Sequence, residues 1–291
     1  MKIGPNSPCW CKSKKKYKVC HMQFDERLKG FSKNPKIELP PREIIKNDKQ
    51  IAGIKKAAKV NNLVLDEVSK MVKEGITTAE IDLLVYKLIT DNGGIPATLG
   101  YYGYPKSVCT SVNEQVCHGI PDDKTVLKSG DIINVDVTTI LDGFYADASR
   151  MFMIGDVAEE TRKLVEVTKE AREVGFKAIK PWETCVGDIG YAISEYVKPF
   201  GYSIIRDIGG HGVGIDFHED PYVCHIGQPM TGMLLVPGMV FTIEPMINMG
   251  KEDFYEDESN GWTIYTEDKK PSAQWEYTVL VTEEGAEIIA Y

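Results

Sequence analysis

The sequence contains no run of about 18 apolar residues, roughly the length that a transmembrane helix requires. Its basic N-terminus is not followed by the apolar stretch of a signal peptide. We therefore expect a cytoplasmic protein without a membrane partner. An excess of positive charge is also missing, since the net charge is −9. This charge argues against a nucleic-acid surface over the whole chain, and no sequence-specific nucleic-acid partner is expected.

A disulfide framework is not indicated either. The chain has seven cysteines, an odd number, and we expect free thiols or metal ligands in a protein that is not exported. A hydrophobic content of 43% in 291 residues supports a large core, in one large domain or two ordinary ones.

Four residues of metal-binding types gather at the N-terminus. Cys9, Cys11, Cys20 and His21 lie within thirteen residues and form one complete tetrahedral ligand set for a structural zinc ion. The alternative is a reduced, lysine-rich tail. The pattern resembles the SEC-C motif over residues 1–22, although Lys-Ser-Lys stands at 12–14 where that family usually has Gly-Ser-Gly.

The lysines of residues 12–18 make this segment a basic patch on an acidic protein. Such a patch is either a solvated charge run or a docking site for ribosomal RNA or another acidic partner. Residues 23–46 follow, with Pro35, Pro40 and Pro41 and no persistent hydrophobic period, which predicts a linker. We expect one larger domain at 47–291.

The segment 131–150 predicts two β-strands joined at Asp142-Gly143. Asp-Gly between apolar, β-branched runs favours a tight hairpin, because the turn needs positive φ. With a two-residue loop, Thr138 faces Asp147, and Asp136 is a diagonal neighbour on the same face, roughly 7–8 Å away. Hard cations between two such carboxylates would remove their repulsion. The alternative is two solvated side chains on an exposed sheet face.

The chain also contains two copies of a helix-helix-strand pattern. Apolar periodicity predicts helices at 47–75, 77–93, 164–178 and 184–197. A constant offset of 108 residues relates Ile81 to Ile189 and Asp136 to Glu244. We expect duplicated halves whose related hairpins meet near a pseudo-two-fold axis, so that acidic residues at matching positions converge on one site.

The second half supplies His211, His218, Glu244 and Glu276. Both glutamates interrupt apolar strands, where a carboxylate is costly unless it is paired or binds metal. Taken singly, a His or Glu in such a position is more often structural than functional. Together with the two aspartates, four carboxylates and one imidazole suit two divalent cations such as manganese, iron or cobalt.

Seven strings carry a specific resemblance to a known family. They are Tyr-Pro-Lys-Ser-Val-Cys (104–109), Cys-His-Gly-Ile-Pro (117–121), Asn-Val-Asp-Val (134–137), Asp-Ala-Ser (147–149), Gly-His-Gly-Val-Gly (210–214), Phe-Thr-Ile-Glu-Pro (241–245) and Ser-Ala-Gln-Trp-Glu (272–276). Over residues 41–291 the chain resembles the type I methionine aminopeptidases of peptidase family M24. The resemblance implies the α+β pita-bread (creatinase/aminopeptidase) fold, in which pseudo-two-fold halves form a curved antiparallel sheet flanked by helices. The zinc-binding segment is a small N-terminal extension.

The resemblance also implies roles for individual residues. The metal ligands would be Asp136, Asp147, His211, Glu244 and Glu276. Of these, Asp147 and Glu276 would bridge two ions, and Glu244 would exchange protons with the attacking water. His118 would contact the scissile nitrogen and His218 the carbonyl oxygen. The methionine pocket would be lined by Tyr101, Tyr104, Cys109, Phe217 and Trp262. Tyr277 and Thr98 depart from the family, which often has His and Cys there.

The implied function is removal of the N-terminal methionine from nascent proteins, with a preference for a small second residue, by a monomeric enzyme. Two alternatives remain at this point. A proline-specific (X-Pro) peptidase shares the fold but usually carries a larger N-terminal domain. A non-catalytic peptide-binding module of this fold usually lacks metal ligands, whereas all five are present here.

Overall fold

Strands β5 (Ile132–Leu141) and β6 (Phe144–Met153) form a hairpin at the centre of the computed structural model, which describes residues 3–291. The turn residues Asp142 and Gly143 have φ of 52° and 80°, as the predicted primed turn requires. Thr138 faces Asp147 across the pair, which confirms the predicted register.

The helices are α1 (Met22–Gly30), α2 (Asp48–Met71), α3 (Thr78–Asp91), α4 (Glu159–Lys177) and α5 (Val186–Val197). The other strands are β1 (Ile37–Glu38), β2 (Ile95–Pro96), β3 (Cys109–Val112), β4 (Gln115–Cys117), β7 (Ser203–Ile204), β8 (Gly210–Gly212), β9 (Glu219–Val223), β10 (Gly232–Met233), β11 (Val240–Ile243), β12 (Met246–Asn248), β13 (Phe254–Glu256), β14 (Ile264–Thr266), β15 (Ser272–Gln274), β16 (Tyr277–Val281) and β17 (Ala286–Ala290). The four helices predicted from periodicity are all present.

Capping side chains fix where two of these helices begin. The Asn47 side chain accepts from the Gln50 N–H at 3.1 Å, and the Gln50 side chain accepts from the Asn47 N–H at 2.9 Å. A capping box of the same kind at Thr77 and Glu80 begins α3, as the spacing predicts. Each box satisfies backbone N–H groups that the first helical turn leaves without partners.

The predicted duplication extends to backbone hydrogen bonds. Helix α3 begins at Thr78 and α5 at Val186, 108 residues later. The β-bridge between Thr77 and Val126 has its counterpart, at the same offset, in the bridge between Cys185 and Leu234. The two halves therefore share a local fold as well as a hydrophobic pattern.

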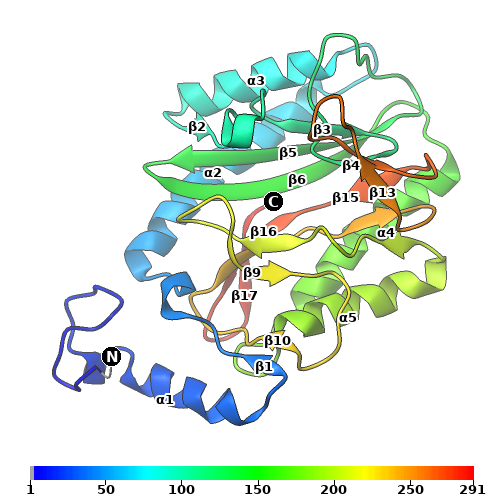
Figure 1. The fold of residues 1–291 in the computed structure, drawn as a ribbon. Helices are drawn as coiled ribbons and strands as arrows, with labels where there is room; N and C mark the ends of the chain where they lie inside the picture. The colour runs from blue at the N-terminus through cyan, green and yellow to red at the C-terminus, as the bar shows by residue number, and fades with distance from the viewer. Residues whose placement is uncertain (1–2) are drawn as a thin grey trace.

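In each half, helices pack against the strands of that half (Figure 1). Helix α2 packs on β5 and β6, α3 packs on α2 and β2, and α4 and α5 pack on strands of the second half. The first half contributes the order β2-β5-β3 with β6 paired to β5, and the second contributes β17-β16-β11-β8-β9. The halves are joined where the Thr278 hydroxyl donates to the Asp147 carbonyl at 2.6 Å and the Glu276 N–H donates to the Ser149 carbonyl at 3.2 Å.

One part of the duplication prediction needs correction. Strands β11 and β16 pair antiparallel, as β5 and β6 do, but no tight turn joins them. Strands β12 to β15 lie between them in the chain, and β14 pairs with β4 of the first half. In the second half, a long segment that contacts the first half therefore takes the place of the hairpin turn.

The segment predicted as an irregular linker also differs from that expectation. Residues Met22–Gly30 form α1, whose Phe24 ring lies 4.9 Å from the Trp182 ring, and the Arg27 guanidinium lies 4.4 Å from the centre of Trp182. β1 pairs in parallel with β10. These contacts hold the segment on the second half. Its apolar residues follow no regular period because each of them packs against a distant part of the chain.

Among residues 3–291, no helix is both long and apolar enough to cross a membrane.

Candidate metal centre

The predicted active-site residues line a single cavity of about 750 Å³. All twelve of them reach it: Tyr101, Tyr104, Cys109, His118, Asp136, Asp147, His211, Phe217, His218, Glu244, Trp262 and Glu276. They come from both halves of the chain and include residues of β5, β6 and β8 and residues next to the ends of β11 and β16.

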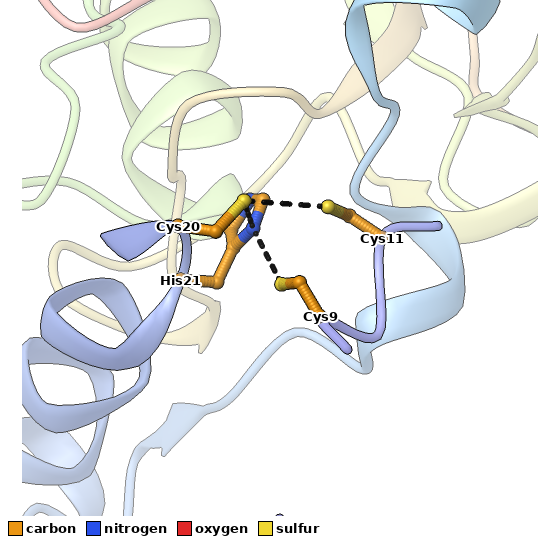
Figure 2. A group of neighbouring side chains, drawn as sticks. All are labelled: Cys9, Cys11, Cys20 and His21. Carbon is orange, nitrogen blue, oxygen red and sulfur yellow. Dashed lines mark hydrogen bonds between the residues drawn. The ribbon is translucent and has the colours of Figure 1, made fainter. Parts of the chain in front are cut away.

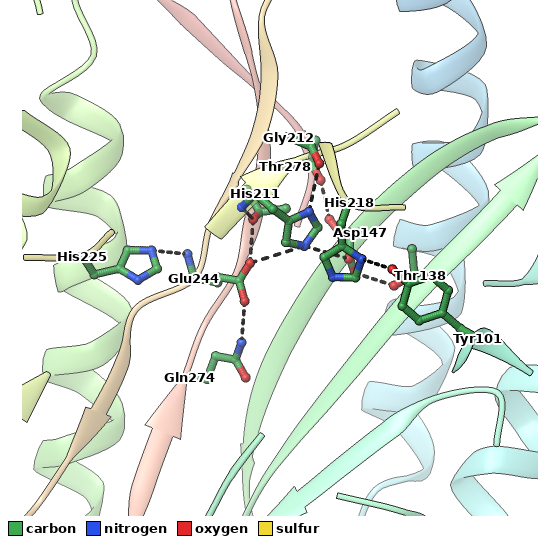
Figure 3. Close-up of polar contacts among 11 residues, drawn as sticks. Tyr101, Thr138, Asp147, His211, Gly212, His218, His225, Glu244, Gln274 and Thr278 are labelled. Atoms are coloured by element: carbon green, nitrogen blue, oxygen red, sulfur yellow. Dashed lines mark hydrogen bonds and ion pairs between the residues drawn. The ribbon is translucent and has the colours of Figure 1, made fainter. Parts of the chain in front are cut away.

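Three of the predicted ligands form the tightest group. One ligand atom each from Asp147, His211 and Glu276 lies within 4.8 Å of the other two. The His211 Nε2 atom is 3.8 Å from Asp147 Oδ2 and 3.7 Å from Glu244 Oε1, and Figure 3 shows these side chains pointing toward one another. Asp136 lies on the Asp147 face of the hairpin and lines the same cavity.

Burial controls the acidity of these groups. Loss of water raises the pKa of the Asp136 carboxyl to about 7 and that of Glu244 to about 8. The pKa values of Asp147 and Glu276 also rise well above their usual range, because of burial first and neighbouring carboxylates second. Burial lowers the pKa of His211 to about 3, so its ring is neutral and able to bind a metal.

Hydrogen bonds fix the orientation of the acidic side chains (Figure 3). The Thr138 hydroxyl donates to Asp147 Oδ1 at 2.8 Å, and the Thr242 hydroxyl donates to Glu244 Oε1 at 2.6 Å. Gln274 Nε2 donates to Glu244 Oε2 at 3.1 Å. Thr242 and Gln274 lie inside two of the seven strings, each two residues before a predicted ligand. Neither was predicted to have a role.

His225 was missed altogether. Its side chain is fully buried, and its Nε2 accepts the Glu244 N–H at 3.1 Å. Burial lowers its pKa to about 3, which keeps the ring neutral and Nε2 available as an acceptor. No spacing rule connects His225 with Glu244, since the contact forms only when the second-half strands are assembled.

Aromatic rings form the wall predicted to hold a side chain. The Tyr101 ring centre is 4.7 Å from that of Phe217, and Tyr104 meets Trp262 edge-on at 5.2 Å. The Tyr104 hydroxyl donates to the Val108 and Gly119 carbonyls, so its ring alone faces the cavity. Cys109, the strand partner of Asp136, stays a thiol because burial raises its pKa.

Two imidazoles lie at the edge of the acidic group. His118 has φ of 56°, a left-handed conformation uncommon for residues other than glycine, and burial lowers its pKa to about 4. His218 Nδ1 is 2.9 Å from the Tyr101 hydroxyl, and burial lowers the pKa of this ring too. Both side chains are therefore neutral near pH 7, and each has one N–H to donate.

The two departures from the family pattern have defined contacts. The Thr98 hydroxyl lies at the cavity wall and donates to the Lys106 carbonyl at 3.1 Å. The Tyr277 hydroxyl donates to Glu173 at 2.5 Å, and the Arg172 guanidinium lies 3.2 Å above the Tyr277 ring. Both departures leave all five predicted ligands in the cavity.

The N-terminal cysteines and His21 form a second donor cluster (Figure 2). One atom from each of Cys9, Cys11, Cys20 and His21 lies within 4.8 Å of the others. The Cys11 and Cys20 sulfurs are 3.5 Å apart, close to the value of about 3.8 Å expected for two thiolates on a tetrahedral zinc with bonds of about 2.3 Å.

The loop of this cluster has two lysines in a left-handed backbone conformation. Lys12 and Lys14 have φ of 60° and 63° and stand where the SEC-C family usually has glycine. A left-handed backbone costs a non-glycine residue about 1–2 kcal/mol. The donor set is retained at that cost.

Comparison with known proteins gives consistent relationships. The profile of metallopeptidase family M24 matches residues 52–283, and that of the SEC-C motif matches residues 6–23. Methionine aminopeptidase from Chlamydia muridarum is 45% identical over 288 residues, which cover 98% of this chain and 97% of the relative. The methionine aminopeptidase of Escherichia coli is 42% identical, covering 84% of this chain and 92% of the relative.

Solved structures confirm the predicted pita-bread fold. The crystal structure of methionine aminopeptidase from Rickettsia prowazekii superimposes with a TM-score of 0.83 at 45% identity, covering 85% of this chain and 99% of that one. Prolidase from Pyrococcus furiosus shares the fold at a TM-score of 0.67 and 24% identity, covering 85% of this chain and 65% of that one. The chain belongs to metallopeptidase family M24 and, within it, to the methionine aminopeptidases, and it carries an N-terminal SEC-C motif.

Proposed function

We propose that this protein removes the N-terminal methionine from nascent polypeptides by metal-assisted hydrolysis of the first peptide bond. One observation supports this most strongly. Three buried carboxylates, the half-buried Asp136 and one neutral imidazole face a single cavity whose adjoining wall is aromatic. Close relatives named methionine aminopeptidase agree with this reading.

We infer that two divalent cations occupy the acidic end of the cavity, held by Asp136, Asp147, His211, Glu244 and Glu276. The donor set fits them, because loss of water raises the pKa of all four carboxyls and bound cations would offset the charge of their ionised forms. Oxygen-rich ligation with one imidazole suits manganese, iron or cobalt. Asp147 and Glu276 are the proposed bridges. Bound there, such ions supply Lewis acidity and lower the pKa of water.

Glu244 is the proposed proton carrier. Its two oxygens accept hydrogen bonds from Thr242 and Gln274, which hold the carboxylate toward the cavity. In this position Glu244 takes a proton from the attacking water and returns it to the departing amine.

The imidazoles complete the proposed arrangement. Burial raises the pKa of the Tyr101 hydroxyl, which therefore keeps its proton, and we assign that hydroxyl as the donor to His218 Nδ1, 2.9 Å away. The remaining proton of neutral His218 then lies on Nε2, where it can donate to the carbonyl oxygen as negative charge develops. His118 is the proposed contact of the scissile nitrogen.

The substrate's first side chain fits the aromatic wall. A thioether is polarisable and favours contact with aromatic faces, which Tyr101, Tyr104, Phe217 and Trp262 provide around Cys109. We propose that the cavity beyond this pocket favours a small second residue.

A peptide assay tests the proposal and its nearest alternative together. With manganese present, the protein should release methionine from Met-Ala-Ser and leave an X-Pro dipeptide intact. Glu244→Gln should lower kcat by roughly 10²–10⁴-fold while the protein stays folded. Cleavage of X-Pro in preference to Met-Ala-Ser would favour a proline peptidase, and unchanged methionine release by Glu244→Gln would contradict the assigned role.

We further propose that the N-terminal cluster binds one zinc ion and docks on the ribosome. The exposed lysines of residues 12–18 offer a cationic surface on an acidic protein. Co-sedimentation with ribosomes should be lower for a Cys9→Ser, Cys11→Ser variant than for the wild type. Equal pelleting of the two proteins would remove the docking role.

A further inference from the structure

Lys46, the last residue of the predicted linker, has a buried side chain that the proposed mechanism does not use. The side chain is 0% exposed, and its ammonium group pairs with Glu219 Oε2. A lysine out of contact with water is costly unless its charge is matched, and removing one partner of such a pair leaves an uncompensated charge. The pair therefore requires both of its members.

The other oxygen of Glu219 holds a loop of the active site. Glu219 Oε1 accepts the N–H of Ile215 at 2.7 Å and the N–H of Asp216 at 3.1 Å. The two residues enclosed by this clamp are Phe217 and His218, which line the cavity together with Glu219 itself. One carboxylate thus connects Lys46 to both ends of the segment that presents them.

The Lys46 end of this connection is fixed by close backbone packing. Its N–H donates to the Gly238 carbonyl at 2.8 Å. Gly238 has φ of 93°, and a Cβ there would lie 2.9 Å from Ile45 Cγ2 and 3.1 Å from the Lys46 carbonyl oxygen, so this approach favours glycine. At the other end, the Gly214 carbonyl accepts the Tyr145 N–H of β6 at 2.9 Å. The loop is therefore anchored to both halves of the molecule.

We propose that Lys46 and Glu219 are positioning residues that hold Phe217 and His218 in the geometry needed for hydrolysis. The proposal deepens the proposed function and rests on it. A misplacement of about 1 Å in a reacting group costs on the order of 10²-fold in rate. Because the ion pair orients the loop and touches no metal ligand, its loss should affect turnover more than substrate or metal binding.

Four variants test the proposal: Lys46→Met, Lys46→Arg, the double variant Lys46→Met/Glu219→Gln, and Lys55→Met as a control. Lys55 forms an ion pair with Glu287 on the surface, where both side chains are exposed. Activity on Met-Ala-Ser with manganese should fall about 10–100-fold in kcat for Lys46→Met and the double variant, with KM within about threefold. Lys46→Arg should recover part of the loss, and Lys55→Met should behave as wild type.

Hydrogen exchange gives a readout that does not depend on the reaction. The Ile215 and Asp216 amides should exchange faster in the double variant than in the wild type or Lys55→Met. A folded double variant with wild-type kcat and wild-type exchange would overturn the proposal. Failure of the double variant to fold would also overturn the proposal. This variant buries no unpaired charge, so its unfolding would mean that the ion pair stabilises the whole domain rather than the loop. A wild type that releases no methionine would instead overturn the proposed function, while the exchange data would still test the clamp.

Discussion

At the scale of single residues, the acidic end of the cavity is unstable without cations. Asp147, Glu244 and Glu276 are buried and Asp136 is half-buried. Loss of water is the largest cause of the raised pKa of each of these four carboxyls. A group whose pKa is raised on folding stabilises the protein below its unfolded pKa and loses that stabilisation as pH rises through its folded pKa.

The metal-free protein should therefore become less stable as pH rises from about 6.5 to 9. Asp136 and Glu244 have folded pKa values of about 7 and 8, against 3.8 and 4.5 ordinarily. Each should reduce the free energy of unfolding by roughly 1 kcal/mol per pH unit below its folded pKa. The buried histidines have the opposite effect, because their lowered pKa values make the folded protein more stable as pH rises. Most of that effect lies below pH 6.5, where the measurement starts. Urea unfolding after chelation measures this slope.

An Asp136→Asn, Glu244→Gln variant is the matched control, because its amides do not titrate. It should show a much flatter dependence over the same range. Equal slopes in the two proteins would mean that these carboxyls are not the source of the pH dependence.

Two lysines at the zinc cluster make a second residue-scale prediction. Lys12→Gly and Lys14→Gly should together tighten zinc binding several-fold, since glycine removes the left-handed strain and gives back part of the gain as unfolded-chain entropy. Competition with a chromophoric chelator measures the affinity. Lys15→Gly, at an exposed position whose φ is not positive, is the control and should not tighten it.

At the scale of elements, the β5–β6 hairpin sets the position of two proposed ligands. Its register depends on a two-residue turn, and a slip of one residue would place Asp136 and Asp147 on opposite faces of the hairpin.

Gly143→Ala should cost about 1 kcal/mol of folding free energy. Gly143 has φ of 80°, and an added Cβ would meet nothing within 4 Å, so only backbone strain is introduced. Gly30→Ala is the control, since its φ is −58° and its surroundings are equally open. A smaller midpoint shift for Gly143→Ala than for Gly30→Ala would argue against the turn type.

Some elements were predictable from sequence and others were not. Asp142-Gly143 and the capping box at Thr77 are local signals, so the hairpin register and the start of α3 could be predicted. Helix α1 and Lys46 depend on distant partners. Lys46 meets Glu219 across 173 residues, and a lysine at the end of a polar segment ordinarily indicates a solvated side chain.

At the scale of the whole molecule, the proposed ligands come from both halves of the duplication. Asp136 and Asp147 belong to the first half, and His211, Glu244 and Glu276 to the second. Cations bound between them would join the halves and stabilise only the assembled fold.

Manganese should therefore raise the thermal midpoint. At a concentration 100 times Kd the gain is about 2.7 kcal/mol, equivalent to roughly 5–10 °C in a domain of this size. Scanning calorimetry measures the shift, and Glu276→Gln should show little of it. An equal shift in Glu276→Gln would indicate that manganese binds elsewhere.

The most direct test of the metal centre is anomalous scattering from crystals soaked in manganese. The arrangement of Asp136, Asp147, His211, Glu244 and Glu276 predicts two peaks about 3.5–4 Å apart, within bonding distance of these five side chains. Absence of peaks in the cavity, or manganese bound only at other residues, would contradict the two-metal account.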